Sequence, residues 1–305
     1  MTRPETAYRK TPILIALALS ILLVFGVIIG AKIVYDRAAQ QPVAMASLDS
    51  PDADTAECQQ FVDALPDTFA GHKRAELAEP APNGAAAWAS SSTERITLRC
   101  GVSVPLQYTK ITPTEEIDGV QWIRVDDATP GSTLRTWFAV NKFPLVAVTA
   151  DDPALDGQGM PLKDLPLDGL ENRNAKPFPI PLAQEAAEAS KSCKHLLEAL
   201  PEQLDDDYAA TNTDLPQTKA WTSFGKEPVV LRCGVEFPKA YKAGAQLQQI
   251  NGVPWFEDTT LGNGTTASTW YPMGRDVVIA VSAPNEGNAV LVQLTKTIRE
   301  STASA

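Results

Sequence analysis

The chain has 305 residues, enough for two domains at roughly 100–200 residues each. Its content of 44% hydrophobic and 21% charged residues is that of a globular protein and excludes a chain that is disordered throughout. The net charge of −11 disfavours binding to nucleic acids, because an acidic surface is repelled by the phosphate backbone.

An apolar segment follows a basic N-terminus. Residues Ile13–Ala31 carry no charge, and with Pro12 they reach about the twenty residues that cross a bilayer as a helix. Three basic residues precede the segment, and the positive-inside rule keeps such an end in the cytoplasm: Arg3, Arg9 and Lys10. The sequence therefore predicts a cytoplasmic tail at 1–11, a transmembrane helix at 12–34 and an extracytoplasmic remainder in the cell envelope.

A cleavable signal peptide is the alternative, since Ala44-Met45-Ala46 has the small-x-small form of a cleavage site. The apolar segment is longer than the core of most signal peptides, and the site lies some way beyond it. An uncleaved anchor is therefore favoured. Residues 35–54, which are poor in apolar patterning, are expected to form a stalk.

Beyond the stalk the chain contains an internal repeat. Residues Trp88–Ala150 align with Trp221–Ala283 without a gap at an offset of 133, and LRCGV occurs at Leu98–Val102 and Leu231–Val235. Two copies of so long a unit indicate a tandem domain duplication rather than a solenoid. Other residues also recur in pairs: Trp88 and Trp221, Trp122 and Trp255, Trp137 and Trp270, Pro66 and Pro201, Cys58 and Cys193.

Each copy predicts an α+β domain, a small antiparallel sheet with helices on one face. A helix that carries the first cysteine, at Ala56–Leu65 and Leu182–Leu200, precedes a variable loop of about thirty residues. A final helix is expected at Ala289–Arg299 in the second copy alone. The strands follow the loop: Ile96–Val104, Val120–Val125, Leu134–Val140 and Leu145–Thr149 in the first copy, and Val229–Phe237, Val253–Glu257, Ala267–Pro272 and Val277–Ser282 in the second.

These elements define repeat domains at 55–150 and 182–301, joined by a Pro- and Gly-rich linker at 151–181 that is expected to be extended. All four cysteines lie in the domains. The helical cysteine and the LRCGV cysteine of one copy face each other across the predicted helix–sheet interface. We therefore expect disulfides Cys58–Cys100 and Cys193–Cys233, which an exported location permits.

The segment Trp221–Pro238, with PVVLRCGV, and the following NGVPW at Asn251–Trp255 resemble the actinobacterial domain of unknown function 3515. The first copy is similar, with TERITLRCGV at Thr93–Val102. The resemblance implies a bacterial host, an envelope location and two cysteines placed as here. It supplies no catalytic residues.

No catalytic or metal-binding motif is present. The two histidines, His72 and His195, fall at unrelated places in the copies, and no GxSxG turn accompanies them, so both are expected to be surface residues. The acidic runs, such as Asp205–Asp207, lack the spacing of calcium loops. We expect no metal and no cofactor.

The best candidate for a binding surface is the set of duplicated arginines and tryptophans. In a strand, the arginine of LRCGV faces away from its leucine and cysteine neighbours and thus from the helices. There, arginine and tryptophan could form a recognition surface; a packed cation–π cluster inside each domain is the alternative. The set is Arg99, Trp122, Trp137, Arg232, Trp255 and Trp270.

These features favour a membrane-anchored binding or scaffolding module whose two copies present similar surfaces to an envelope protein or a wall polymer. The alternative is an envelope hydrolase or transferase with an unrecognised site. An apolar cleft that holds two carboxylates, or a histidine with a serine, would favour that alternative. The sequence makes no prediction of oligomeric state.

Overall fold

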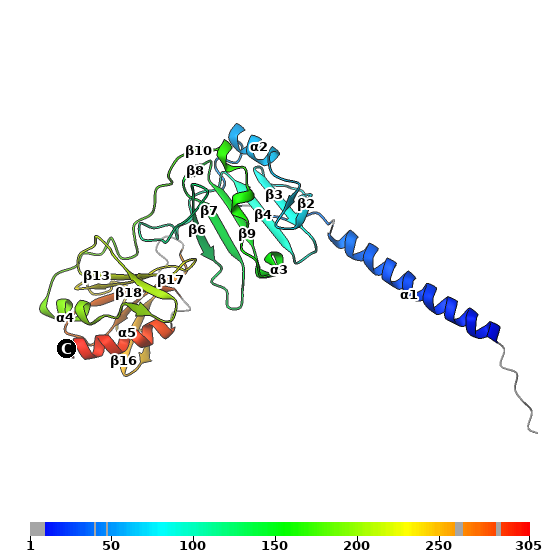
Figure 1. The fold of residues 1–305 in the computed structure, drawn as a ribbon. Coiled ribbons are helices and arrows are strands. Elements are labelled where there is room, and N and C mark those ends of the chain that lie inside the picture. The colour runs from blue at the N-terminus through cyan, green and yellow to red at the C-terminus, as the bar shows by residue number, and fades with distance from the viewer. Residues whose placement is uncertain (1–9, 40, 47, 260–264, 285–287) are drawn as a thin grey trace, which may run out of the picture.

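The structure, a computed structural model, describes residues 10–39, 41–46, 48–259, 265–284 and 288–305 (Figure 1). Helix α1 (Lys10–Ala39) projects from two folded domains. Within it, Pro12–Val34 is long and apolar enough to cross a membrane, and none of that stretch is buried against the rest of the protein. Most of the expected cytoplasmic tail, residues 1–9, lies outside the described residues.

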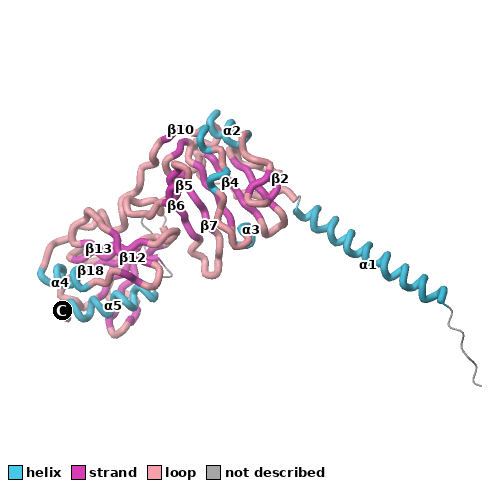
Figure 2. Tube along the Cα trace, in the orientation of Figure 1, coloured by secondary structure: helices cyan, strands magenta, loops and turns pink. Residues whose placement is uncertain are grey.

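Each domain is built on one antiparallel eight-stranded sheet, and the two sheets have the same strand order (Figure 2). The first runs β1-β2-β3-β4-β9-β7-β6-β5. Its strands are β1 (Thr68–Phe69), β2 (His72–Ala75), β3 (Ala85–Ala89), β4 (Arg95–Cys100), β5 (Glu115–Ile117), β6 (Val120–Asp126), β7 (Arg135–Ala139) and β9 (Val146–Ala150). A separate pair joins β8 (Lys142–Phe143) to β10 (Glu171–Asn172).

The second sheet runs β11-β12-β13-β14-β18-β17-β16-β15. Its strands are β11 (Gln203–Leu204), β12 (Tyr208–Thr211), β13 (Thr218–Thr222), β14 (Val229–Cys233), β15 (Leu247–Ile250), β16 (Val253–Asp258), β17 (Ala267–Pro272) and β18 (Ile279–Pro284). The predicted pair of α+β repeats is therefore confirmed.

A short helix opens each domain and is fastened to the central strand by a disulfide. Helix α2 (Ala56–Asp63) is capped by Thr55, and α4 (Lys191–Ala199) is capped by Ser190. In both, the cap hydroxyl accepts a hydrogen bond from the backbone N–H of the helical cysteine. The expected disulfides are present: Cys58–Cys100 links α2 to β4, and Cys193–Cys233 links α4 to β14.

The main core lies between each sheet and the elements on this helical face. In the second domain α5 (Asn288–Ser301) completes the cover, with Leu291, Leu294 and Ile298 buried. The first domain uses the segment after β9 instead, which contains α3 (Asp152–Leu155) and the 3-10 turns η1 (Leu162–Asp164) and η2 (Leu167–Gly169). Its buried leucines belong to the first core: Leu155, Leu162, Leu165, Leu167 and Leu170. Much of the expected extended linker thus packs as part of the first domain.

The opposite face of each sheet is covered by the chain segment that precedes the first helix of that domain. In the first domain, Val43 bridges Leu77 in parallel, and the Asp52 N–H donates to Gly101 O at 3.1 Å. In the second, the Glu188 N–H donates to Gly234 O at 2.9 Å. Part of the expected stalk, within Val43–Asp54, therefore packs against the first domain.

Further predicted features differ from the structure. Strands β1–β3 and β11–β13 lie in what we predicted to be a variable loop, because β3 is alanine-rich and buried at every position and so shows no alternation. Helix α4 begins at Lys191 rather than Leu182, since residues before Ser190 cross the sheet. The strands that we predict after LRCGV match the observed ones within a few residues, whereas β5, β8 and β15 have no predicted counterpart.

Candidate functional site

The four candidate tryptophans lie in the cores of the domains, not on a surface. Trp122 and Trp255 are 1% and 0% exposed, and Trp137 and Trp270 are 7% and 5% exposed. The strand register places their side chains on the same face of the sheet as the leucine and cysteine of LRCGV. This is the face that the helices cover. The expected surface of tryptophan and arginine is not formed, because large indole rings fill the space beneath the helices.

The two LRCGV arginines lie on the other face, as predicted, but beneath chain segments. Arg99 donates from Nη2 to Ala46 O, and burial lowers the pKa of its guanidinium. Arg232 is 5% exposed, and its Nε and Nη1 make no hydrogen bond to the described part of the chain. The duplicated arginines and tryptophans are therefore structural residues of the fold that the two copies share.

The residues that build a site are instead those in which the copies differ. The turn between β13 and β14 inserts Phe224 and Gly225 against strand β6 of the first domain. Arg124 Nη2 donates to Phe224 O at 2.9 Å, its guanidinium lies 4.8 Å from the Phe224 ring centroid, and it forms an ion pair with Asp126 at 2.7 Å. The Asp126 N–H donates to Gly225 O at 2.8 Å.

Further polar contacts hold the domains together beside this turn. Gln107 Nε2 donates to Glu227 Oε1 at 3.3 Å, and Lys110 Nζ lies 3.6 Å from Asp214 Oδ2. The connecting segment also takes part, since the Phe178 N–H donates to Tyr108 O at 2.8 Å. The second domain is thus docked onto the first rather than tethered by a free linker.

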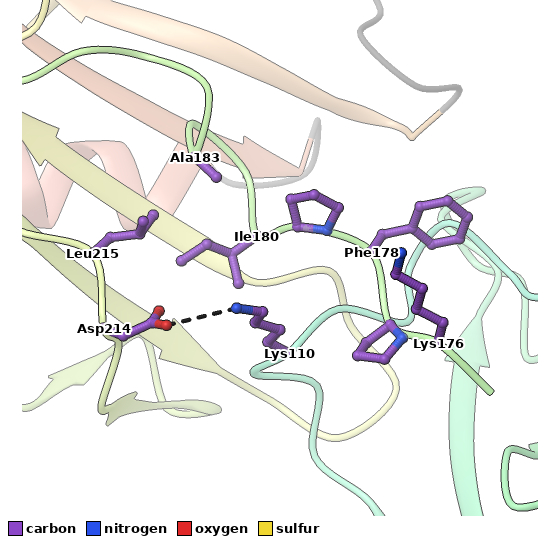
Figure 3. Close-up of a pocket in the computed structure, with 9 residues that line it drawn as sticks. Lys110, Lys176, Phe178, Ile180, Ala183, Asp214 and Leu215 are labelled. Atoms are coloured by element: carbon purple, nitrogen blue, oxygen red, sulfur yellow. Dashed lines mark ion pairs between the residues drawn. The ribbon is translucent and has the colours of Figure 1, made fainter. Parts of the chain in front are cut away.

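A crevice follows this junction along the connecting segment Lys176–Glu185, which we call the strap. One hollow of about 390 Å³ lies between the strap, the Lys110 loop of the first domain and the Asp214 loop of the second (Figure 3). Its walls are mainly apolar and include Pro177, Pro179 and Ile180 of the strap and Leu215 of the second domain. Figure 3 shows Lys110 and Asp214 meeting beside it.

A second hollow of about 340 Å³ lies between the strap and the sheet of the second domain. It is more polar, because its lining includes four polar residues of the sheet and one carboxylate of the strap: Asp258, Thr269, Tyr271, Ser282 and Glu185. Burial, and then the nearby Glu185 and Asp258 charges, raise the pKa of Tyr271 to about 12. Its phenol is therefore a neutral hydrogen-bonding group across the physiological range.

The two histidines lie in different environments. His195 is exposed on α4, as expected. His72 is 7% exposed, so the expectation of a surface histidine is wrong there: both of its ring nitrogens have partners in the first domain. Among the described residues, no group of three acidic, histidine or cysteine side chains could hold a metal ion.

The residues that are identical in the two copies carry no signal of this crevice. At an offset of 133, Arg124 corresponds to Glu257, and Phe224 and Gly225 correspond to Ser91 and Ser92. These differences, in a chain otherwise repeated, are the signal that could have located the junction.

The fold is that of a tandem pair of disulfide-stapled α+β domains behind an apolar helix. A family model described as a protein of unknown function (DUF3515) matches residues 17–166 and 169–305. The chain therefore belongs to the DUF3515 family, with two copies. No curated protein and no solved structure matches the chain significantly.

Proposed function

We propose that the protein is a membrane-anchored, extracytoplasmic binding module of the bacterial cell envelope, and that its ligand occupies the crevice beside the strap. The single observation that carries the proposal is the junction of Arg124, Asp126, Phe224 and Gly225, which exists only because the copies have diverged.

The chemistry of the crevice favours an extended, partly apolar ligand. One hollow offers proline and aliphatic walls, and the adjoining hollow offers hydroxyl and carboxylate groups. Volumes of this size suit a short peptide segment of an envelope protein or a few units of a wall polymer. The docked arrangement supports one composite site, so avidity from two independent copies is not needed.

The disulfides and the apolar helix support an extracytoplasmic location. The uncleaved anchor is supported by the contacts of the segment after α1. Cleavage after Ala46 would remove Val43, which is 2% exposed and bridges Leu77. Loss of this strand pairing would expose part of the first sheet.

Site-specific photo-crosslinking in intact cells tests the proposal. A photoreactive residue at Ala183, in the crevice, should give a defined adduct, whereas one at Lys296, exposed on α5, should not. Gly225→Val should abolish the Ala183 adduct because it opens the junction. Equal adducts from both positions, or none from Ala183, would contradict the proposed site.

A further inference from the structure

A serine and a histidine meet in the first domain, away from the crevice. His72 Nε2 lies 2.6 Å from Ala154 O, and His72 Nδ1 lies 2.7 Å from Ser90 Oγ. A carbonyl oxygen only accepts hydrogen bonds, so Nε2 carries the proton and donates it to Ala154 O. In the neutral ring, Nδ1 is therefore an acceptor, and the Ser90 hydroxyl donates to it.

This chain of hydrogen bonds is the one found at an activated serine nucleophile. A base accepts from the serine hydroxyl, and its other nitrogen is fixed by an oxygen acceptor that sets the tautomer. The Ala154 carbonyl takes the orienting place that a carboxylate often fills. Burial of His72 at 7% exposure holds the ring in place, while Ser90 itself is exposed to incoming molecules.

A cavity of about 730 Å³ lies beside the histidine, whereas the exposed Ser90 lies outside its lining. His72, Ala154 and Glu94 contribute to its wall, together with Asp156 and Asp164. Among the residues that the structure describes, no lysine or arginine lines it. The volume is within the range of small-molecule sites, and the acidic wall favours neutral or cationic ligands over anionic ones.

We propose that Ser90 and His72 form a nucleophile and general-base pair for acyl transfer from a neutral or cationic ester or amide. Ser90 Oγ attacks the acyl carbon, and its proton passes to His72 Nδ1. The same proton then leaves with the departing alcohol or amine as its bond to the acyl carbon breaks. Water attacks the acyl-serine, gives its proton to Nδ1, and Ser90 departs with that proton while the acid is released.

The backbone next to Ser90 suits the charge that develops in this reaction. The Ser90 N–H is bonded to Glu94 O at 3.1 Å, which fixes the turn between β3 and β4. The N–H of the next residue, Ser91, makes no hydrogen bond to the described residues. An amide directly after the nucleophile is a common donor to an acyl oxyanion.

The second copy provides a natural control. Tyr208 begins β12 as His72 begins β2, and each pairs with the last residue of the preceding strand, Leu204 or Phe69. Tyr208 donates its hydroxyl to Glu227 O at 3.1 Å. The serine at the Ser90 position is Ser223, so the second copy has the hydroxyl without the imidazole.

The test is covalent labelling of the full chain, in detergent micelles, by a neutral alkyl phosphonofluoridate. Ser90 should displace fluoride and form a serine–phosphorus bond, and peptide mass mapping should place the adduct on Ser90. His72→Tyr, which copies the second domain, should slow labelling roughly 100-fold, the contribution typical of a general base. Ser90→Ala should abolish it.

Ser223→Ala is the matched control and should label as fast as the wild type. Thermal melting verifies that each variant is folded. Ser90→Ala removes an exposed hydroxyl together with its hydrogen bond to His72 Nδ1, and its result is readable even if His72→Tyr is destabilised. An unlabelled Ser90 in the folded wild type, or equal labelling of Ser90 and Ser223, overturns the proposal. Crosslinking at Ala183 reports the crevice separately.

Discussion

At the scale of single residues, sterics explain why the LRCGV motif has a glycine in both copies. Gly101 and Gly234 both have φ of +80°, and the segment before the first helix crosses directly over each. A Cβ on Gly234 would lie 2.1 Å from Glu188 O, and one on Gly101 would lie 2.3 Å from Asp52 C. Backbone atoms cannot yield as a flexible side chain can, so the motif excludes any larger residue.

Gly234→Ala should therefore lower the free energy of unfolding by about 3 kcal/mol or more, because left-handed strain and the clash with Glu188 act together. Gly252→Ala is the matched control. It has φ of +83° but nothing within 4 Å of its Cβ, so it should cost only about 1 kcal/mol. Urea unfolding followed by tryptophan fluorescence measures both, and equal costs would refute the steric explanation.

Tyr271 makes a second prediction at this scale. Its pKa of about 12 in the folded protein exceeds the ordinary value of about 10, so the folded state holds the phenol proton more tightly. Its contribution to stability is complete below pH 10 and is lost as the pH rises toward 12. Burial also raises the pKa of Tyr108, so absorbance titration at 295 nm should show late-titrating tyrosines, of which Tyr271→Phe removes one; an unchanged titration curve would disprove this assignment.

At the scale of elements, the two copies cover equivalent cores by different means. Trp255 Nε1 donates to Thr295 Oγ1 of α5 at 3.1 Å, whereas the Nε1 of Trp122 has no partner within the described residues. The first domain packs leucines from the segment after β9 over its core. A duplicated sheet thus accepts either a regular helix or an irregular cover, provided that the cover is apolar.

Replacing Thr295 by valine leaves Trp255 Nε1 buried without a partner, which should cost about 1–3 kcal/mol of stability. Thr297→Val, on the same helix but only partly buried, should be nearly neutral. Near-ultraviolet circular dichroism and thermal melting should separate the two variants. A Thr295→Val protein as stable as the Thr297→Val protein would show that this hydrogen bond contributes little.

The same contrast explains what the sequence could predict. Strands such as β4 and β14 alternate or carry long apolar runs, and the duplication doubled the signal from each. The disulfide partners followed from the repeat. Strand β3 gives no alternating signal because it is buried at every position, and the cover of the first core has prolines and glycines among its leucines, a composition typical of a linker. Contacts between segments far apart, such as His72 with Ser90, leave no local pattern.

At the scale of the whole molecule, the junction fixes the two domains as one unit. Gly225 lies at φ of +89°, and a Cβ there would lie 2.5 Å from Asp126 Oδ2 and 2.6 Å from Arg124 Nε. The second domain has Glu257 in place of Arg124, and the first domain has Ser91 in place of Phe224. The surfaces needed to repeat this contact with a second chain are therefore missing. The contact is therefore internal.

Gly225→Val should open the junction without unfolding either domain. Hydrogen exchange of the Asp126 amide, bonded to Gly225 O, should become at least about tenfold faster, since the free energy that protects it falls by more than about 1.4 kcal/mol. Gly131→Val, also at positive φ but with open space at its Cβ, should leave Asp126 exchange unchanged. Equal exchange in both variants would refute the role of Gly225.

The pairing of Val43 with Leu77 also limits how far the first domain can lie from a membrane that holds α1. Only residues 40–42 separate the end of α1 from that pairing, and the helix continues past Val34 for about 8 Å at 1.5 Å per residue. With α1 in a bilayer, the first domain would ride just above the lipid headgroups. On the topology proposed above, targets deep in the cell wall would be out of reach, whereas molecules held at the membrane surface would be within reach of the first domain.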